Sequence, residues 1–319
     1  MRRILALSLF LFAADVAAAE PARTLKIATW NMEWLIAPNV LRPMREHCAP
    51  KDTPIGGNDR RVPCDVALKF DRSTADFRAM ARYAEELDAD VVALQEVDGE
   101  SAASLVFSSY DFCFTSRRHV QNNGFAIRQG VPHRCEADLQ ALSNNDSVRR
   151  GSVVTLFPGE KREIHLLSVH LKSGCNRDTL VSGRKPCREL SKQVRPLEDW
   201  IDTQARAGRR FAILGDFNRN LSNDLGPART SDDRSLHLWS EIDDSDPPGA
   251  DLINTAESQR FVNCSPEARY SSYIDYIVLG KALGQAMVPG SFGRVLYRAR
   301  DGRNLKLSDH CPVSVRIGL

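Results

Sequence analysis

The chain has 319 residues, of which 43 are lysine or arginine and 41 are aspartate or glutamate, giving a formal net charge of +2. So small a balance argues against binding nucleic acid through a basic field over the whole molecule, although local basic patches stay possible. A chain of about 300 residues can form one large layered domain or two ordinary ones. Because no repeat, low-complexity run or composition break marks a linker, the sequence favours one α/β domain.

The first 19 residues have the order of a secretory signal peptide. The basic pair Arg2 and Arg3 precedes an apolar run from Ile4 to Ala14, and small residues follow up to Ala19. The run is too short to span a bilayer, and the alternative is a buried N-terminal helix. We expect cleavage after Ala19, a catalytic domain over residues 20–319, and a secreted or periplasmic monomer without a stable membrane span.

All eight cysteines lie beyond the predicted cleavage point. An even count in an exported chain predicts disulfides. Pairing neighbours in order would close separate polar loops, so we expect the bonds Cys48–Cys64, Cys113–Cys135, Cys175–Cys187 and Cys264–Cys311. A cysteine metal site is less favoured because the chain has no C-x-x-C or C-x-x-H motif.

Taken in chain order, hydrophobic periodicity predicts alternating strands and helices. Strands at Thr24–Asn31 and Asp90–Gln95 enclose a helix over 74–87, which Ser73 can cap. A second helix is expected over 188–206, and loops over 37–72 and 218–249. Further strands are expected at 149–157, 164–171, 211–214, 272–279 and 312–317, with weak alternation over 112–130.

Polar side chains follow or interrupt these apolar strands repeatedly. They are Asn31, Glu96, His170, Asp216, Asn218, Asp275, Asp309 and His310. Strand ends on one edge of a sheet gather into one crevice. We therefore expect these residues to form one site.

The stretch ILGDFN delivers Asp216 and Asn218 from a buried strand, and we expect Gly215 to let the backbone approach a ligand. The alternative is a turn in which both side chains bond local backbone. Glu96 follows a fully apolar strand, where a carboxylate suits Mg²⁺. After the strand histidine His170, Lys172 and Ser173 offer an ammonium and a hydroxyl to an oxyanion, although a lone strand histidine is more often structural.

Asp275 interrupts the apolar strand SYIDYIVL, and a buried carboxylate needs a partner. His310 is the best candidate, oriented by the acid as in many hydrolases. Asp309 would then face the other way and could join Glu96 at a metal. The chain lacks a G-x-S-x-G elbow, an H-E-x-x-H helix, a Walker loop and a G-x-G-x-x-G loop, which excludes those chemistries.

The ordered motifs TWN, QE, SVH, GDFN, IDYIV and SDHCPV, from Thr29 to Val313, resemble the endonuclease/exonuclease/phosphatase superfamily. The resemblance implies a four-layered α/β sandwich, two packed mixed sheets flanked by helices, with the site at one edge between the sheets. It also implies Mg²⁺ or Mn²⁺ at Glu96, with Asn31 and Asp309 nearby, and hydrolysis of phosphate esters by an activated water.

Carried over by motif, His310 with Asp275 is the general base or a phosphate clamp, and Asp216 with Asn218 positions water and phosphate. Either Asp216 or His310 could take the proton. His170 would donate a proton to the leaving oxygen or stabilise charge. No acid that could orient His170 is recognisable, and Glu33 is left outside the site.

We therefore expect an exported phosphodiesterase, with nucleic acid as the leading substrate and Asn31, Lys172 and Ser173 binding it. Local charge favours this substrate, although charge runs are usually solvated faces. The charged residues are Arg117, Arg118, His119, Arg128, His133, Arg134, Arg149 and Arg150. The alternatives are a lipid phosphodiesterase or phosphomonoesterase of the same superfamily, and a binding module that has lost catalysis.

Overall fold

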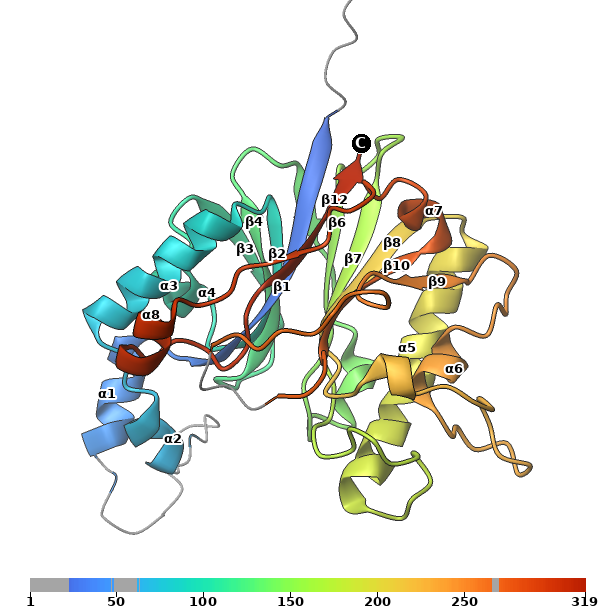
Figure 1. Cartoon of the computed structure of the whole chain (residues 1–319), viewed down its shortest axis with the longest axis horizontal. Coiled ribbons are helices and arrows are strands. Elements are labelled where there is room, and N and C mark those ends of the chain that lie inside the picture. The colour runs from blue at the N-terminus through green and yellow to red at the C-terminus, as the bar shows by residue number, and fades with distance from the viewer. Residues whose placement is uncertain (1–22, 47, 49–61, 63, 266–269) are drawn as a thin grey trace, which may run out of the picture.

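A computed structural model describes residues 23–46, 48, 62, 64–265 and 270–319 of the chain. The predicted signal peptide and its cleavage site lie outside these residues. Two mixed six-stranded sheets pack face to face, and helices cover both outer faces (Figure 1). This is the predicted four-layered α/β sandwich. In the described ranges, we find no helix with the length and apolar character needed to cross a membrane.

The first sheet has the strand order β11-β12-β1-β2-β4-β3 and the second β5-β6-β7-β8-β10-β9. Only the neighbours β1 and β2, and β7 and β8, run parallel among the described strand pairs. The strands of the first sheet are β1 (Thr24–Leu35), β2 (Val91–Val97), β3 (Tyr110–Phe114), β4 (Asn122–Arg128), β11 (Gly293–Arg294) and β12 (Val313–Gly318). Those of the second are β5 (His133–Cys135), β6 (Ser152–Leu156), β7 (Ile164–His170), β8 (Arg210–Asp216), β9 (Leu252–Asn254) and β10 (Asp275–Gly280).

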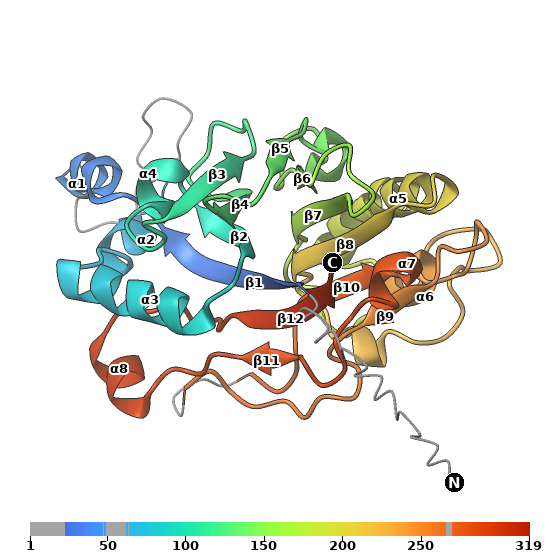
Figure 2. The same ribbon diagram turned by 90° about the horizontal axis from the view of Figure 1, so that it is seen from above.

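Helices on the side of the first sheet are α1 (Pro38–Glu46), α2 (Cys64–Lys69), α3 (Thr74–Leu87), α4 (Glu100–Ala103) and α8 (Ala299–Asn304). Helices on the side of the second are α5 (Lys185–Arg206), α6 (Leu238–Ile242) and α7 (Lys281–Gly284). Short 3-10 turns lie at Gln140–Ser143 and Leu221–Asn223. Seen from above, the two sheets separate these helix groups (Figure 2).

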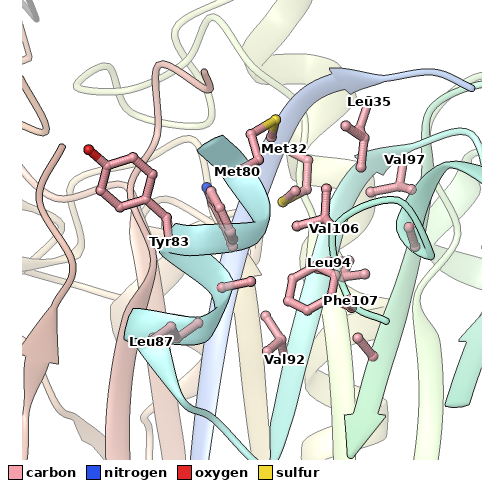
Figure 3. Close-up of a cluster of buried hydrophobic side chains, with 14 of the residues drawn as sticks. Met32, Leu35, Met80, Tyr83, Leu87, Val92, Leu94, Val97, Val106 and Phe107 are labelled. Atoms are coloured by element: carbon pink, nitrogen blue, oxygen red, sulfur yellow. The ribbon is translucent and has the colours of Figure 1, made fainter. Parts of the chain in front are cut away.

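Alternation along the strands builds a separate apolar layer on each sheet face. In β1, Ile27 joins the layer between the sheets, whereas Trp30 points to the layer under α3. That second layer packs Met80 and Tyr83 of α3 against Leu94 of β2 (Figure 3). A third layer joins α5 to the outer face of the second sheet. The central strands β2, β7 and β8 are buried on both faces, which explains their continuous apolar runs.

The predicted helix over 74–87 is confirmed with its cap. Ser73 accepts a hydrogen bond from the backbone N–H of Asp76, and Asp76 accepts one from the backbone of Ser73, forming a capping box. The second predicted helix is also present but begins at Lys185, because Pro186 can occupy the first turn, where no N–H partner is needed.

Other boundaries differ from the prediction. The expected loop over 37–72 contains the short helices α1 and α2, and the loop over 218–249 contains α6. Asp275 begins β10 and does not interrupt it, because residues 272–274 precede the strand. The closing strand likewise begins at Val313, one residue after Pro312.

All four predicted disulfides are present. Cys113 of β3 and Cys135 of β5 bond the edge strand of one sheet to the edge strand of the other. Cys264 and Cys311 join the segment before β10 to the segment before β12. The described residues include no free cysteine.

Candidate active site

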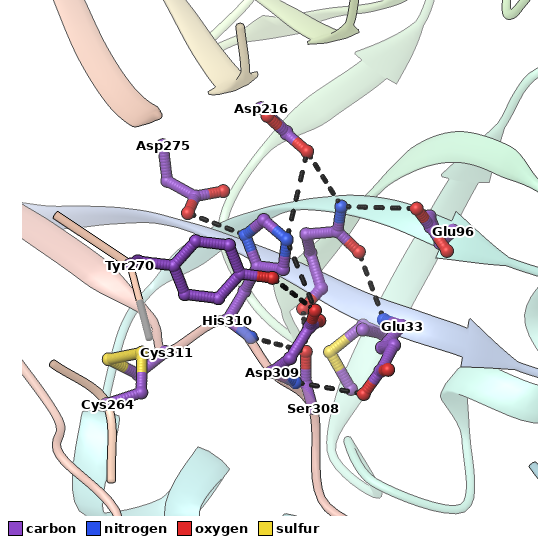
Figure 4. Close-up of polar contacts among 12 residues, drawn as sticks. Glu33, Glu96, Asp216, Cys264, Tyr270, Asp275, Ser308, Asp309, His310 and Cys311 are labelled. Atoms are coloured by element: carbon purple, nitrogen blue, oxygen red, sulfur yellow. Dashed lines mark hydrogen bonds and ion pairs between the residues drawn. A yellow bond between two sulfur atoms is a disulfide. The ribbon is translucent and has the colours of Figure 1, made fainter. Parts of the chain in front are cut away.

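The strand topology brings the predicted polar residues to one edge of both sheets (Figure 4). Asn31 and Glu96 lie near the ends of the parallel strands β1 and β2. His170 and Asp216 end the parallel strands β7 and β8 and are register partners. Asp275 pairs with Asp216 from the antiparallel strand β10. The predicted convergence is therefore confirmed.

Asp216 lies at the centre of this group and is buried. Its Oδ2 accepts hydrogen bonds from Nδ2 of Asn31 at 3.0 Å and Nδ2 of Asn218 at 3.2 Å. Its Oδ1 accepts the backbone N–H of Asn218 at 2.7 Å. Nε2 of His170 and Nε2 of His310 lie 3.4 and 3.9 Å from Oδ2. One carboxylate thus contacts both histidines and both amides of the predicted site.

The turn at Asp216–Asn218 has features of both sequence interpretations. Asn218 adopts φ of +53° and bonds the backbone oxygen of Leu171, so it has a structural role as well as a place at the site. The expected role of Gly215 is wrong. A Cβ there would lie 1.9 Å from the backbone oxygen of Val169, so this glycine permits close packing of β8 on β7 and not the approach of a ligand.

Glu96 reaches the site through an irregular backbone. The pairing of β2 shifts register on both sides, against β1 and β4, and Glu96 has φ of +58°. Such bulges turn a side chain to a new direction and are common beside active sites. The carboxylate accepts the backbone N–H of Trp34 at 3.2 Å and lies 3.5 Å from Nδ2 of Asn31. Nε2 of His170 is 3.7 Å from Oε1.

His310 is held by contacts to its ring and to its backbone. Its Nδ1 lies 2.7 Å from Oδ2 of Asp275. Its backbone N–H donates to Oγ of Ser308, whose hydroxyl donates to the backbone oxygen of Asn31 at 2.7 Å. The backbone oxygen of His310 accepts hydrogen bonds from Trp30 and from the hydroxyl of Tyr297. These contacts fix the imidazole with Nε2 toward Asp216.

Burial and charge shift the pKa values of these groups in different directions. Burial opposes the charged form of His310, but the carboxylates of Asp275, Asp216 and Asp309 outweigh it and raise the His310 pKa well above its usual value. Burial raises the pKa of Asp216 to about 7, against the lowering effect of His310. Burial, with the charge of Arg149, lowers the pKa of His170 well below its usual value. These shifts favour the charged form of His310 and the neutral form of His170.

His170 has no orienting acid, as the sequence indicated. Its Nδ1 is buried and lacks a hydrogen-bond partner among the described residues. Only its Nε2 faces carboxylates, those of Glu96 and Asp216. A neutral imidazole with its proton on Nε2 directs that N–H toward both carboxylates, at 3.7 and 3.4 Å, without a short hydrogen bond to either, so we assign that tautomer.

The expectation that Asp309 faces away from His310 is wrong, because Oδ1 of Asp309 lies 3.7 Å from Nε2 of His310. The backbone N–H of Asp309 donates to Oε2 of Glu33 at 2.9 Å, and its Oδ2 accepts the hydroxyl of Tyr270 at 2.5 Å. The sequence interpretation left Glu33 outside the site and missed Tyr270. The positive φ of Glu33, +44°, turns its side chain toward Asp309, and no sequence motif signals this turn. Burial and the neighbouring Asp309 raise the pKa of Glu33.

Lys172 and Ser173 follow β7 at the same edge. The backbone N–H of Lys172 bonds Oε1 of Gln193, and its ammonium lies 2.9 Å from the backbone oxygen of Ser173. Burial and the charge of Arg149 lower the pKa of Lys172. Arg149 itself donates to the backbone oxygen of Leu171, while its Nε is buried without a partner among the described residues. In the sequence, the pair Arg149 and Arg150 just before β6 was the feature that could have indicated a place for Arg149 in the site.

The donor atoms of the site fit a divalent cation. Asp216, Asp275 and His310 form the one group of acids, histidines or cysteines in the described residues whose ligand atoms lie within 4.8 Å of one another, and when His310 is protonated the two carboxylates of this group are the ligands. Oδ1 of Asp275 is buried and has no hydrogen-bond partner among them. The predicted ligands Glu96 and Asp309 are outside this group, but they add carboxylate oxygens that Mg²⁺ or Mn²⁺ prefers. Nδ2 of Asn31 faces two carboxylates, and its Oδ1 accepts the backbone N–H of Glu33 at 3.0 Å and keeps a second lone pair for a cation.

The predicted basic cluster divides into two. Arg117, Arg118 and His119 follow β3, and Arg149 and Arg150 precede β6; both positions lie on the edge that holds the site. The antiparallel strands carry the remaining three, Arg128, His133 and Arg134, to the opposite end. The site-edge group borders a cavity of about 500 Å³ lined by Ser116, Arg117, Arg118, His119, Asp146 and Arg150.

A second cavity opens on the other flank of the site. It has a volume of about 560 Å³ and reaches the carboxylates of Glu33 and Asp309. Its other lining residues include Lys69, Phe70, Tyr270 and Lys306. The site thus has room, and basic or aromatic side chains, on both sides of the central carboxylates.

Comparison with known proteins agrees with this architecture. A family model described as the endonuclease/exonuclease/phosphatase family matches residues 28–310. No curated protein shows significant sequence similarity to the chain.

Solved structures with the same fold include a humanised TDP2 from D. rerio, with a TM-score of 0.56 and 17% identity over 93% of this chain and 99% of that one. An AP endonuclease from Archaeoglobus fulgidus has a TM-score of 0.56 and 12% identity, over 92% and 100%. A 3'-5' exonuclease from Neisseria meningitidis has a TM-score of 0.54 and 15% identity, also over 92% and 100%. At these identities the likeness establishes the fold.

Proposed function

The chain belongs to the endonuclease/exonuclease/phosphatase family, and from this we propose that it is an exported, Mg²⁺- or Mn²⁺-dependent phosphodiesterase that hydrolyses nucleic acid. The observation that carries the proposal is the convergence of Asp216 with two amides and two histidines at one edge of both sheets. Acids, amides and imidazoles in one crevice match the needs of phosphoester hydrolysis by water.

The cation would be held by carboxylates on the Glu96 side of the site, with Asp309 and the oxygen of Asn31 as further ligands. When bound there, Mg²⁺ supplies charge neutralisation to the phosphate and lowers the pKa of a water. Glu96 is suited to this role because its only hydrogen-bond donors among the described residues are the backbone of Trp34 and the amide of Asn31.

The pKa shifts favour Asp216 over His310 as the proton acceptor. A pKa of about 7 leaves Asp216 able to take a proton from an attacking water near neutral pH. His310 is already protonated, because Asp275 and its neighbours raise its pKa. Its Nε2–H is therefore suited to hold a phosphate oxygen. The backbone N–H and the side-chain amide of Asn218 each donate a hydrogen bond to Asp216 and keep it in place.

Neutral His170 acts in this scheme as a hydrogen-bond donor. Because its pKa is lowered well below the usual value, it does not store a proton for the leaving oxygen at neutral pH. Its Nε2–H, together with the guanidinium of Arg149, can stabilise negative charge as it develops on the phosphate. Lys172 and Ser173 follow His170 just beyond the end of β7 and would bind the substrate.

The two cavities beside the site support the assignment of nucleic acid as the substrate. Arg117, Arg118 and Arg150 lie on one flank and Lys69 and Lys306 on the other. A phosphodiester chain that crosses the catalytic carboxylates would meet cations on both sides, and phosphate contacts provide most non-specific nucleic-acid affinity. The predicted signal peptide and the four disulfides support export.

The test is a substrate panel with the protein secreted in its disulfide-bonded form. Supercoiled plasmid, RNA, bis(p-nitrophenyl) phosphate, sphingomyelin, phosphatidylinositol phosphates and a simple monoester are compared with Mg²⁺ or Mn²⁺ present. We expect plasmid or RNA to be cleaved best and EDTA to stop cleavage. Faster hydrolysis of a lipid or monoester, or turnover that persists in EDTA, would overturn the assignment.

A further inference from the structure

A group of carboxylates lies between α5 and α6, on the side of the second sheet away from the catalytic residues. Glu198 and Asp202 are one helical turn apart on α5, and Glu241 is on α6. Asp244 and Asp246 follow α6 in the turn that leads to β9. We define these five residues as the α5–α6 acidic cluster.

Three carboxylates of this cluster, those of Glu198, Asp202 and Glu241, are buried and incompletely paired, whereas Asp244 and Asp246 are exposed. Glu198 is 6% exposed and Glu241 is 2% exposed. Oε2 of Glu198, Oε2 of Glu241 and Oδ1 of Asp202 are all buried without a hydrogen-bond partner in the part of the chain that the structure describes. A buried carboxylate oxygen without a partner is costly, so three in one place call for a missing partner.

The nearby cations do not neutralise the cluster. Arg206 bonds the Oδ2 atom of Asp202, and Arg229 bonds the Oε1 atom of Glu241 and also pairs with Asp233. Each guanidinium thus contacts one cluster oxygen and leaves the buried oxygen of the same residue unpaired. Burial and the charges of Asp244, Asp202 and Glu241 raise the pKa of Glu198 to about 8.

We propose that the α5–α6 acidic cluster binds a divalent cation, Ca²⁺, separate from the catalytic metal. Ca²⁺ takes six to eight oxygen ligands in adaptable geometry, and the cluster offers several carboxylates on helices and a turn. No three carboxylates of the cluster have ligand atoms within 4.8 Å of one another, so its buried carboxylates must move closer together when the ion binds. The bound ion would clamp the turn after α6 to α5.

Thermal unfolding of the secreted protein with and without Ca²⁺ tests this site, which does not depend on the proposed catalytic function. We expect saturating Ca²⁺ to raise Tm by roughly 3–8 °C, by mass action on the folded state. The shift should persist in Glu96→Gln, which alters the catalytic crevice, and in Asp199→Asn, which removes an exposed carboxylate of the same helix. Glu198→Gln, whose neutral amide fits the same space, should abolish it.

A second readout guards against a variant that unfolds. Trp200 and Trp239 belong to the elements that carry the cluster, so bound Tb³⁺ should show emission sensitised by tryptophan that Ca²⁺ displaces. Asp202→Asn should weaken this signal at least tenfold. An unchanged Tm of the wild-type protein in Ca²⁺ would show that protonation of Glu198 accommodates the buried charge without an ion. An equal shift in Glu198→Gln would show that Ca²⁺ binds elsewhere, and either result would overturn the proposal.

Discussion

The Nδ1 atom of His310 lies 2.7 Å from Oδ2 of Asp275, and the two residues come from segments that precede β12 and begin β10. The pair fixes both the direction of the ring and its charge, since Asp275 is the carboxylate that contributes most to raising the His310 pKa. A histidine held in this way presents one Nε2–H to the crevice at neutral pH.

Loss of this imidazole should abolish turnover. We expect His310→Gln to lower kcat for bis(p-nitrophenyl) phosphate by at least about 10³-fold, and Asp275→Asn by about 10²-fold, because the ring loses its orientation and charge. Far-ultraviolet circular dichroism checks folding. His165→Gln is a matched control, since His165 also pairs with an acid, Glu163, but at the opposite end of β7. A normal rate in His310→Gln would remove this residue from the mechanism.

Replacing Glu96 should weaken the binding of the catalytic metal without unfolding the sheet. We expect Glu96→Gln to need at least tenfold more Mg²⁺ for half-maximal activity, because an amide lacks the charge that a hard cation prefers. The measurement is initial rate against Mg²⁺ concentration. Glu100→Gln, a change just beyond the same strand at the start of α4, serves as the control. An unaltered metal dependence would exclude Glu96 as a ligand.

The divided basic cluster predicts two classes of arginine variant. Arg117→Ala with Arg118→Ala should raise KM for plasmid DNA by roughly tenfold at low salt and flatten its salt dependence, because phosphate contacts are lost. Hydrolysis of bis(p-nitrophenyl) phosphate should hardly change. Arg128→Ala with Arg134→Ala, at the far end of the sheets, should leave the hydrolysis of both substrates unchanged. Equal losses in the two double variants would indicate general charge attraction.

The bond between Cys264 and Cys311 should affect both stability and rate. It closes a loop with a sequence separation of 47 residues, for which chain entropy predicts about 4 kcal/mol of stabilisation. Replacing both cysteines by serine should lower Tm and also reduce kcat well below the melting range, because Cys311 adjoins His310. The Cys113–Cys135 bond, at the sheet edges, should affect Tm alone when replaced. Full activity without Cys264 and Cys311 would separate the disulfide from the site.

The raised pKa of Glu198 predicts a pH-dependent stability in EDTA. A carboxyl group with a folded pKa near 8 and an ordinary value of 4.5 in the unfolded chain favours folding when protonated. Burying the ionised Glu198 lowers the free energy of unfolding. This loss is absent below about pH 4.5, grows as the pH rises and is complete above about pH 8. Glu198→Gln should therefore stabilise the protein most at pH 8–9, in chemical denaturation, and little near pH 5. A stabilisation that is equal at both pH values would contradict the shift.

Sequence pattern predicted the regular elements and the convergent edge because each depends on local rules. The helix over 74–87 has a cap and a 3.6-residue apolar period, and the strand before Asp216 is a continuous apolar run between polar ends. Polar residues after parallel strands must meet at one edge. The disulfides also followed from order along the chain.

Other parts of the site depend on tertiary contacts that no local pattern carries. Glu33 reaches Asp309 only because two residues of β1, Glu33 and Trp34, have positive φ angles. Tyr270 bonds Asp309 from 39 residues away. The sequence suggested that Gly215 approaches a ligand, because the close approach of the Val169 backbone, which is on another strand, cannot be read from the residues around Gly215. The short helices α1 and α2 lack the length over which periodicity is readable.

Because β1 pairs with β12, the site can form only late in the synthesis of the chain. Thr29 pairs with Val313, so the strand that carries Asn31 and the segment that carries His310 meet only after almost the whole described chain is available. β12 also lies inside its sheet, between β1 and β11. A growing chain that lacks this strand cannot hold His310 in place, nor the hydrogen bond from Ser308 to the backbone oxygen of Asn31. The proposed phosphodiesterase activity can therefore begin only after β12 has been synthesised and has paired with β1.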